Sequence, residues 1–229
     1  MTIPAAQLPG DPLAAARAYD RWFDGGWGRY AFDIEVAAIR DALGPLRGAR
    51  ILDAGCGTGR LLQYLIAAGA RPTGLDADAG MLEVARQHVL VPLVRDDICA
   101  LPFQSETFDA AVALTVLEFI DDVPRAIGEL CRVTRRDGRI VVGALTPRSP
   151  WGVAHRRRFE DPLWTRARFL TRRDLRRLGA TCGQVRLHGV LFAPGRVPRA
   201  PLLGRALEAA GRAVPCAGAV QIIVIERRS

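Results

Sequence analysis

Short apolar segments alternate with amphipathic segments between residues 49 and 146, and this alternation constrains the fold more than any other feature. The apolar segments have the length of buried strands and cover residues 49–53, 73–76, 91–95, 108–114 and 139–144. Between them the spacing predicts helices over residues 60–68, 79–89 and 123–133, and Asp78 is the expected N-cap of the second helix. Strands and helices that alternate through short connections predict right-handed crossovers and a doubly wound, mostly parallel α/β sheet.

Segments on either side of this region predict further elements. Two helices are expected within residues 12–43, because Gly25 and Gly26 interrupt the helical pattern there. A turn at Asp137 and Gly138 is expected before the fifth apolar segment. After residue 146 the pattern predicts helices over 172–178 and 202–212, strands over 184–190 and 219–225, and a Pro-rich connector over 194–201.

The basic residues exclude some kinds of chemistry. The chain has 229 residues and a net charge of +8, and all 32 of its basic residues are Arg. A mechanism that needs a Schiff-base lysine or the lysine of a phosphate-binding loop is therefore excluded.

The cysteines and the apolar runs bear on the compartment. The five cysteines are widely spaced and include no Cys-x-x-Cys, which argues against a disulfide framework and against a zinc site. We expect reduced thiols, no metal and a cytoplasmic protein. The start of the chain lacks the pattern of a signal peptide, and no apolar run has the length of a membrane span.

The most informative segment is the glycine-rich turn at residues 51–59, Ile-Leu-Asp-Ala-Gly-Cys-Gly-Thr-Gly. Gly55, Gly57 and Gly59 allow a tight turn and a close approach of a ligand to the backbone. Free N–H groups at the start of the following helix favour an anionic ligand group. The spacing differs from the Gly-x-Gly-x-x-Gly of dinucleotide-binding proteins. Taken alone, the segment is also compatible with a purely structural turn.

Acidic residues follow the next two predicted strands. Asp76 ends the second strand, where a doubly wound fold presents a carboxylate to a ribose diol, although an Asp there can also cap a helix. Asp97 and Ile98 follow the third strand, where a carboxylate can accept from an adenine amine and Ile can pack on the ring. Asp96 and Asp97 are equally compatible with a solvated turn. Residues 108–119 bring the end of the fourth strand to the same crevice.

In combination, these segments closely resemble the successive motifs of class I S-adenosylmethionine-dependent methyltransferases. The nearest branch is the type 11 group, which includes ubiquinone and menaquinone C-methyltransferases. The resemblance covers residues 50–146 in order and is carried by residues 51–59, 74–76, 97–98, 101–103, 108–109 and 132–139.

The resemblance implies a Rossmann-like sheet of seven mostly parallel strands, with an antiparallel last strand at residues 219–225. It also implies a single methyltransferase domain over residues 1–229. Within it we expect a helical cap at 12–43, a cofactor-binding core at 49–146, and a segment at 147–229 that holds a second helical cap after the fifth strand, the substrate side and the C-terminal strands.

The resemblance further implies S-adenosylmethionine as the cofactor and a role for individual residues. Asp53 would orient the glycine-rich turn or accept a hydrogen bond from the ligand's amino group. Gly55 and Gly57 would face the methionine moiety, and Asp76 would hold the ribose.

The other end of the cofactor would lie against a second group of residues. The side chain of Met81 would pack near the adenine, which Asp97 and Ile98 would hold. Leu114 would touch the methionine portion through its backbone. Tyr19 resembles an N-terminal Tyr that closes over the cofactor in this group, and Tyr30 also fits that role.

Methyl transfer from a sulfonium is an in-line displacement, in which positioning supplies much of the rate. A general base is needed only for an acceptor that carries a proton of high pKa. The sequence therefore needs no catalytic triad. Its candidate bases are His155 and Glu118, with His188 and His88 as weaker alternatives.

A run of arginines after the fifth predicted strand leaves other functions open. The run comprises Arg156, Arg157, Arg158, Arg166, Arg168, Arg172, Arg173, Arg176 and Arg177. It can bind RNA, an anionic membrane surface or an acidic substrate, or it can be a solvated face. Interleaved aromatic residues can stack bases or line a small-molecule pocket: Trp151, Phe159, Trp164 and Phe169.

These features leave one main hypothesis and two alternatives. We expect a methyltransferase with an anionic or aromatic small-molecule substrate, without a transmembrane segment, that contacts membranes at most peripherally. One alternative is a protein of the same fold that binds RNA or an anionic membrane through residues 156–177. The other is an NAD-dependent oxidoreductase, against which the glycine spacing and Asp97–Ile98 argue. The sequence leaves the oligomeric state open.

Overall fold

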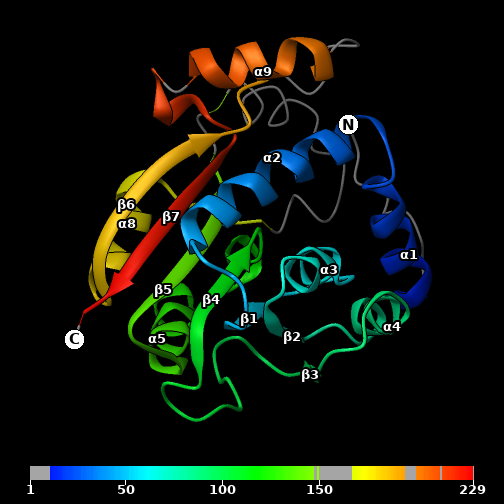
Figure 1. Cartoon of the computed structure of the whole chain (residues 1–229), viewed down its shortest axis with the longest axis vertical. Coiled ribbons are helices and arrows are strands. Elements are labelled where there is room, and N and C mark those ends of the chain that lie inside the picture. The colour runs from blue at the N-terminus through cyan, green and yellow to red at the C-terminus, as the bar shows by residue number, and fades with distance from the viewer. Residues whose placement is uncertain (1–10, 147–148, 150–166, 194–199, 212, 229) are drawn as a thin grey trace.

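One sheet forms the centre of the computed structural model, which describes residues 11–146, 149, 167–193, 200–211 and 213–228. Within these residues the sheet has seven strands in the order β3-β2-β1-β4-β5-β7-β6 (Figure 1). The strands are β1 (Arg50–Ala54), β2 (Arg71–Asp76), β3 (Leu93–Arg95), β4 (Phe108–Leu114), β5 (Thr134–Leu145), β6 (Gly183–Val190) and β7 (Val220–Arg227). The first five strands pair in parallel, and β7 runs antiparallel to β5 and β6. The predicted doubly wound sheet with an antiparallel last strand is therefore confirmed.

Helices cover both faces of this sheet. They are α1 (Pro12–Trp22), α2 (Gly26–Leu43), α3 (Arg60–Ala67), α4 (Ala79–His88), α5 (Val123–Val133), α8 (Arg172–Ala180) and α9 (Ala200–Gly211), with short 3-10 turns η2 (Leu117–Phe119) and η3 (Pro215–Ala217). Apolar residues of α2 and α3 pack with one face of the sheet, and those of α5 and α8 pack with the other. In the part of the chain that is described, none of the helices has the length and apolar character needed to span a membrane.

The place of β7 in the sheet explains why residues 222–225 are apolar without alternation. This strand lies between β5 and β6, with Val142 opposite Ile223 and Leu187 opposite the same residue on the other side. Ile222 and Val224 pack toward the α2 side, whereas Ile223 and Ile225 pack toward the α8 side. A strand that is covered on both faces favours apolar residues at successive positions.

The turn expected at Asp137 and Gly138 is wrong. The structure continues β5 through these residues, so that one strand runs from Thr134 to Leu145. The pairing with β4 shifts in register there, because Phe108 lies opposite Thr134 while Ala110 lies opposite Arg139. Asp137 has a left-handed φ of 58°, so the irregularity is an outward bulge between two paired stretches of the strand.

The structure describes the first predicted cap region, whereas most of the second lies outside the described residues. Two helices form within residues 12–43 as predicted, and Gly25 caps the second of them. α1 packs against α4, on the side of the sheet where β1 and β2 end (Figure 1). Most of the second cap falls on residues 150–166, outside the described residues. The Pro-rich connector ends earlier than expected, because α9 already begins at residue 200.

Candidate functional site

A pocket opens at the carboxyl ends of β1 and β4, where the glycine-rich turn meets the two N-terminal helices. Its volume is about 440 Å³, including the part open to solvent. The turn supplies one wall through Gly55, Gly57 and their neighbours, and α1 and α2 supply the other. Side chains of interest that line it are Tyr19, Glu35, Asp53, Arg60, Leu114 and Thr115.

The glycine-rich turn is held by the neighbouring strand. The N–H groups of Gly55 and Cys56 both donate to the carbonyl of Leu75, at 2.7 and 2.9 Å. Gly55 has a φ of 80°, and a Cβ there would approach Val116 to 2.5 Å. Any side chain at this position would therefore strain the turn and clash with the residue behind it. This geometry explains why the motif needs glycine at position 55.

Asp76 fixes the turn from the end of β2. Its Oδ2 accepts a hydrogen bond from the Gly57 N–H at 2.8 Å, and its Oδ1 accepts from the Asp78 N–H at 2.9 Å. Burial raises the pKa of Asp76 above its usual range, and the hydrogen bonds from Asp78 and Gly57 oppose that effect. The N-cap of α4 is Asp78, which accepts from Gly80 and Met81. The helix-cap role considered for Asp76 therefore belongs to Asp78.

Asp53 is a buried acid with an unsatisfied oxygen. Its side chain is 1% exposed, and its Oδ2 has no hydrogen-bond partner among the described residues. Burial and the nearby charge of Asp76 raise the pKa of Asp53 to about 8. Buried carboxyls of this kind require a partner, and a ligand ammonium group in the adjoining pocket would supply one.

Tyr19 and Tyr30 occupy different places, although both fit the expected closing residue. Tyr19 lines the pocket from α1, and burial, then the charge of Glu35, raises the pKa of its phenol above the usual range. Tyr30 instead donates to Glu208 of α9 at 3.4 Å. The structure thus brings Tyr19 to the turn and Tyr30 away from it.

Two charged residues of the pocket lining were missed by the sequence reasoning. Glu35 lies on the buried stripe of α2 with Ala31 and Ile39, and its carboxyl lines the pocket. A lone acid among apolar positions at i, i+4 spacing was the signal that could have found it. Arg60 begins α3, and its guanidinium binds Asp20 at 2.7 Å and Asp24 at 2.7 Å, both near the end of α1. No local pattern indicates that long-range pair.

The residues expected at the adenine are not among those that line this pocket. Met81 lies half-buried in the first turn of α4. Asp97 is exposed, and its Oδ1 accepts from the Cys99 N–H at 2.8 Å. The side chain of Ile98 is buried in the core under α5. The backbone places the start of this connection beside β2, since the Asp96 N–H lies 3.3 Å from the Asp76 carbonyl.

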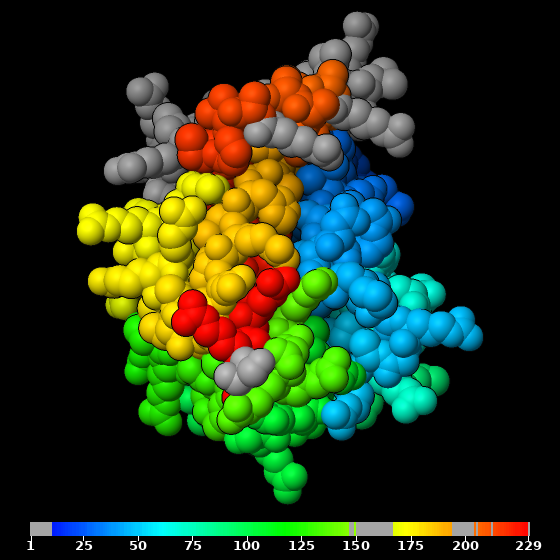
Figure 2. All heavy atoms as spheres, turned by 60° about the vertical axis from the view of Figure 1, so that its left-hand side comes forward, coloured from blue at the N-terminus to red at the C-terminus, as the bar shows by residue number. Residues whose placement is uncertain are grey.

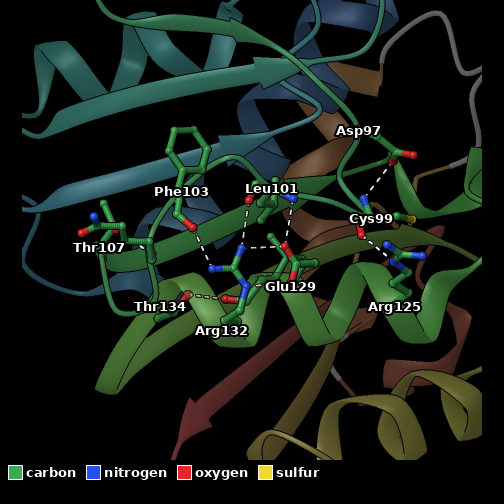
Figure 3. A network of polar contacts seen from close by, with 11 residues as sticks. Asp97, Cys99, Leu101, Phe103, Thr107, Arg125, Glu129, Arg132 and Thr134 are labelled. Carbon is green, nitrogen blue, oxygen red and sulfur yellow. Dashed lines mark hydrogen bonds and ion pairs between the residues drawn. The ribbon is translucent and has the colours of Figure 1, made fainter.

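The connection that carries Asp97 is anchored on α5 (Figure 3). Arg125 donates to the Cys99 carbonyl at 2.8 Å. Arg132 donates to the carbonyls of Leu101 and Phe103, while Glu129 accepts from the Leu101 N–H. Charged side chains thus replace a regular backbone ladder along residues 99–103, which holds this edge of the crevice in place.

The candidate bases lie outside the pocket lining, or outside the described residues. Glu118 is fully buried; its Oε1 accepts from the Leu145 N–H and its Oε2 has no partner among the described residues. Burial raises the pKa of Glu118 to about 7. His188 lies exposed on β6, and His88 contacts the Thr58 carbonyl and Asp20. His155 falls among the residues that the structure does not describe.

The first described members of the arginine run have partners, since Arg168 pairs with Asp121 and Arg172 donates to Gln221. The other described members lie on α8. Arg173, Arg176 and Arg177 are exposed there, opposite the buried Leu175, and α8 forms part of the yellow surface in Figure 2. None of them lines the pocket. Arg156, Arg157, Arg158 and Arg166 lie outside the described residues, as do Trp151, Phe159 and Trp164.

Comparisons with known proteins find similarity to methyltransferases. Residues 52–142 match the family model described as a methyltransferase domain. The chain is 40% identical over 99 residues to the malonyl-(acyl-carrier protein) O-methyltransferase of Pectobacterium atrosepticum, covering 43% of this chain and 39% of that protein. It is 34% identical over 185 residues to an uncharacterized protein of Mycobacterium bovis, covering 79% of this chain and 62% of that protein. The chain thus spans less than two thirds of the length of either relative.

A solved structure matches over nearly the whole chain. It is a methyltransferase of Thermotoga maritima described as S-adenosylmethionine-dependent and as a possible histamine N-methyltransferase. The TM-score is 0.74 at 26% identity, and the match covers 93% of this chain and 95% of that one. These matches support neither the oxidoreductase alternative nor the alternative of RNA or membrane binding.

Proposed function

We propose that this chain, a member of the class I S-adenosylmethionine-dependent methyltransferases of the type 11 group, transfers the sulfonium methyl group to a small-molecule acceptor. S-adenosylmethionine is the cofactor of this domain. The observation that carries the proposal is the conjunction of the glycine-rich turn with the unpartnered Oδ2 of Asp53 in one pocket. Together these two features fit a ligand that carries an ammonium group, which the carboxylate would bind. The same ligand would carry hydrogen-bond acceptors that face the backbone N–H groups of the turn.

Different residues would bind different parts of the cofactor. Asp53 would accept from the ammonium group, and Gly55 and Gly57 would face the methionine portion, with the backbone of Leu114 on its other side. Tyr19 would close over this end from α1. Asp76 would hold the ribose, and Met81, Asp97 and Ile98 would hold the adenine from the edge that α5 anchors.

The chemistry needs little from the protein beyond positioning. When bound, the cofactor supplies a methyl group that is already electrophilic. The chain's task is to hold the reacting atoms close to a line and to exclude water, which can contribute about 7–11 kcal/mol in favourable cases. Among the described residues no histidine lines the pocket, which is consistent with an acceptor that needs no strong general base.

The name of a similar protein supports a small acceptor, and the pocket bears on the acceptor's charge. Two acids, Glu35 and Asp53, line the pocket and favour a cationic or neutral group close to them. The Thermotoga maritima protein is described as acting on a small amine, and only as a possibility. The anionic acceptor expected from the sequence would need the arginine-rich side, away from these two acids.

Incubation with isotopically labelled S-adenosylmethionine tests the proposal. Purified protein is added to small-molecule extracts, and mass spectrometry searches for a labelled product that is missing with Asp53→Asn. We expect label in one or a few low-mass compounds. Failure of the wild-type protein to bind S-adenosylmethionine or S-adenosylhomocysteine at millimolar concentration would overturn the proposal.

A further inference from the structure

We propose that Glu35 is a specificity-determining residue that makes the pocket prefer the cationic methyl donor to its neutral thioether product. The inference rests on the proposed function and deepens it. It concerns an acid on α2, outside the glycine-rich turn and outside the core motifs at residues 50–146.

Glu35 is a largely buried acid for which the described residues supply no hydrogen bond or ion pair. Its side chain is 9% exposed and lines the pocket. None of the described residues donates a hydrogen bond to it or pairs with it, and the lining cation Arg60 is already bound to Asp20 and Asp24. An acid held in this way costs free energy unless a ligand cation completes it.

The elements that carry the two acids indicate which part of the pocket each one serves. The helix α2, which carries Glu35, packs on β5 and β7, and its apolar residues share a cluster with Ala110 and Val112 of β4. Asp53 lies on β1, opposite Gly74 of β2 and Val112 of β4. Glu35 thus reaches the pocket from the β5 side, whereas Asp53 reaches it from the strand beside β2.

This separation matters because the donor carries two cationic groups and the product carries one. In the transfer, the acceptor's lone pair forms the new bond to carbon. The carbon–sulfur bond breaks, its electron pair stays on sulfur, and any acceptor proton leaves to solvent. The ammonium persists while the sulfonium charge disappears. With Asp53 completed by the ammonium, Glu35 is the acid left for the charge that is lost, and it therefore favours donor over product.

Calorimetric titration of three ligands into three proteins tests this inference. The ligands are S-adenosylmethionine, S-adenosylhomocysteine and sinefungin, in which an amine replaces the methylated sulfonium. Glu35→Gln keeps the shape and removes the charge. We expect it to reduce the donor-to-product affinity ratio by about tenfold, as expected for one buried charge pair, and to weaken sinefungin in parallel with the donor.

The controls separate the possible failures. Asp53→Asn should weaken all three ligands alike, because the ammonium is common to them. Glu35→Asp should keep the donor preference, and it serves if the Gln variant does not fold. An unchanged ratio in Glu35→Gln, or an equal loss for all ligands, would overturn the inference and leave the proposed function intact. If the wild-type protein binds none of the ligands, the proposed function itself fails.

Discussion

At the scale of single residues, acids with the same chemistry have different roles because their partners differ. Both oxygens of Asp76 accept backbone N–H groups, so this acid shapes the turn. Asp53 and Glu35 line the pocket instead, and the Oδ2 of Asp53 has no donor among the described residues. Replacement of Asp76 and replacement of Glu35 are therefore expected to have different effects.

Replacement of Asp76 by Ala should weaken S-adenosylhomocysteine binding by about 1–3 kcal/mol. The ribose would lose a charged acceptor, and Gly57 would lose the acceptor of its N–H. Calorimetry measures the affinity, with Asp41→Ala as the control because Asp41 is an exposed acid paired with Arg40. An unchanged affinity would remove Asp76 from the site.

The buried acids also predict how stability depends on pH. Burial, then the charge of Glu118, raises the pKa of Glu35 to about 8. A carboxyl whose pKa is raised on folding holds its proton more tightly in the native state, so its contribution is full at low pH and is lost as pH rises toward 8. The ligand-free protein should therefore lose stability between about pH 5 and pH 8.

Glu35→Gln should flatten this dependence, by up to about 1.4 kcal/mol per pH unit. Urea unfolding at a series of pH values measures the slope. Asp53 and Glu118 also face this region and their pKa values are raised to about 8 and about 7, so a residual slope should remain. The same slope in variant and wild type would contradict the burial of Glu35 as an uncompensated acid.

At the scale of elements, the position of α1 depends on one arginine. Arg60 of α3 binds Asp20 and Asp24, and the side chains of Arg60 and Asp20 are only 20% and 12% exposed. Removal of one partner from a partly buried pair leaves the other charge uncompensated, which costs more than the loss of an exposed pair. α1 in turn carries Tyr19 to the pocket, so the pair links helix docking to the site.

Arg60→Ala should loosen α1 before it unfolds the sheet. We expect amide exchange along residues 12–22 to accelerate by about tenfold or more, as for a loss of at least 1.4 kcal/mol in local stability, together with weaker cofactor binding. Hydrogen exchange measured by mass spectrometry reports the exchange of α1 and that of the sheet separately. Arg40→Ala, which removes an exposed pair with Asp41, should leave α1 unchanged. Equal acceleration in the two variants would show that Arg60 does not hold the helix.

At the scale of the whole molecule, ligand binding should appear as thermal stability. The pocket joins α1, α2, β1, α3 and β4, so a ligand there ties the N-terminal helices to the sheet.

S-adenosylhomocysteine at 100 times its Kd should add about 2.7 kcal/mol by mass action, which corresponds to roughly 5–11 °C in Tm for a chain of this size. Scanning fluorimetry checks this, with NAD as the matched nucleotide control that should give no shift. A shift with NAD alone would favour the oxidoreductase instead.

The sequence by itself determined the local elements and their order. The spacing around residues 108–114 and 123–133 predicted β4 and α5 to the residue, and Asp78 was predicted as the cap of α4. Such features depend on neighbours within a few positions, so local patterns of apolar and capping residues suffice. The glycine-rich turn is likewise local, because Gly55 has a left-handed φ that favours glycine at this position.

Only the tertiary structure decided which side chains meet in the pocket. It placed Tyr19 there and Tyr30 elsewhere, and it brought Glu35 of α2 to the glycine-rich turn. It also paired Arg60 with Asp20, which is far away in the sequence. It also continued β5 through Asp137, because pairing with β4 on both sides outweighs the local preference of Asp-Gly for a turn. These outcomes depend on contacts between distant elements, and local spacing carries no information about which of several faces will be brought together.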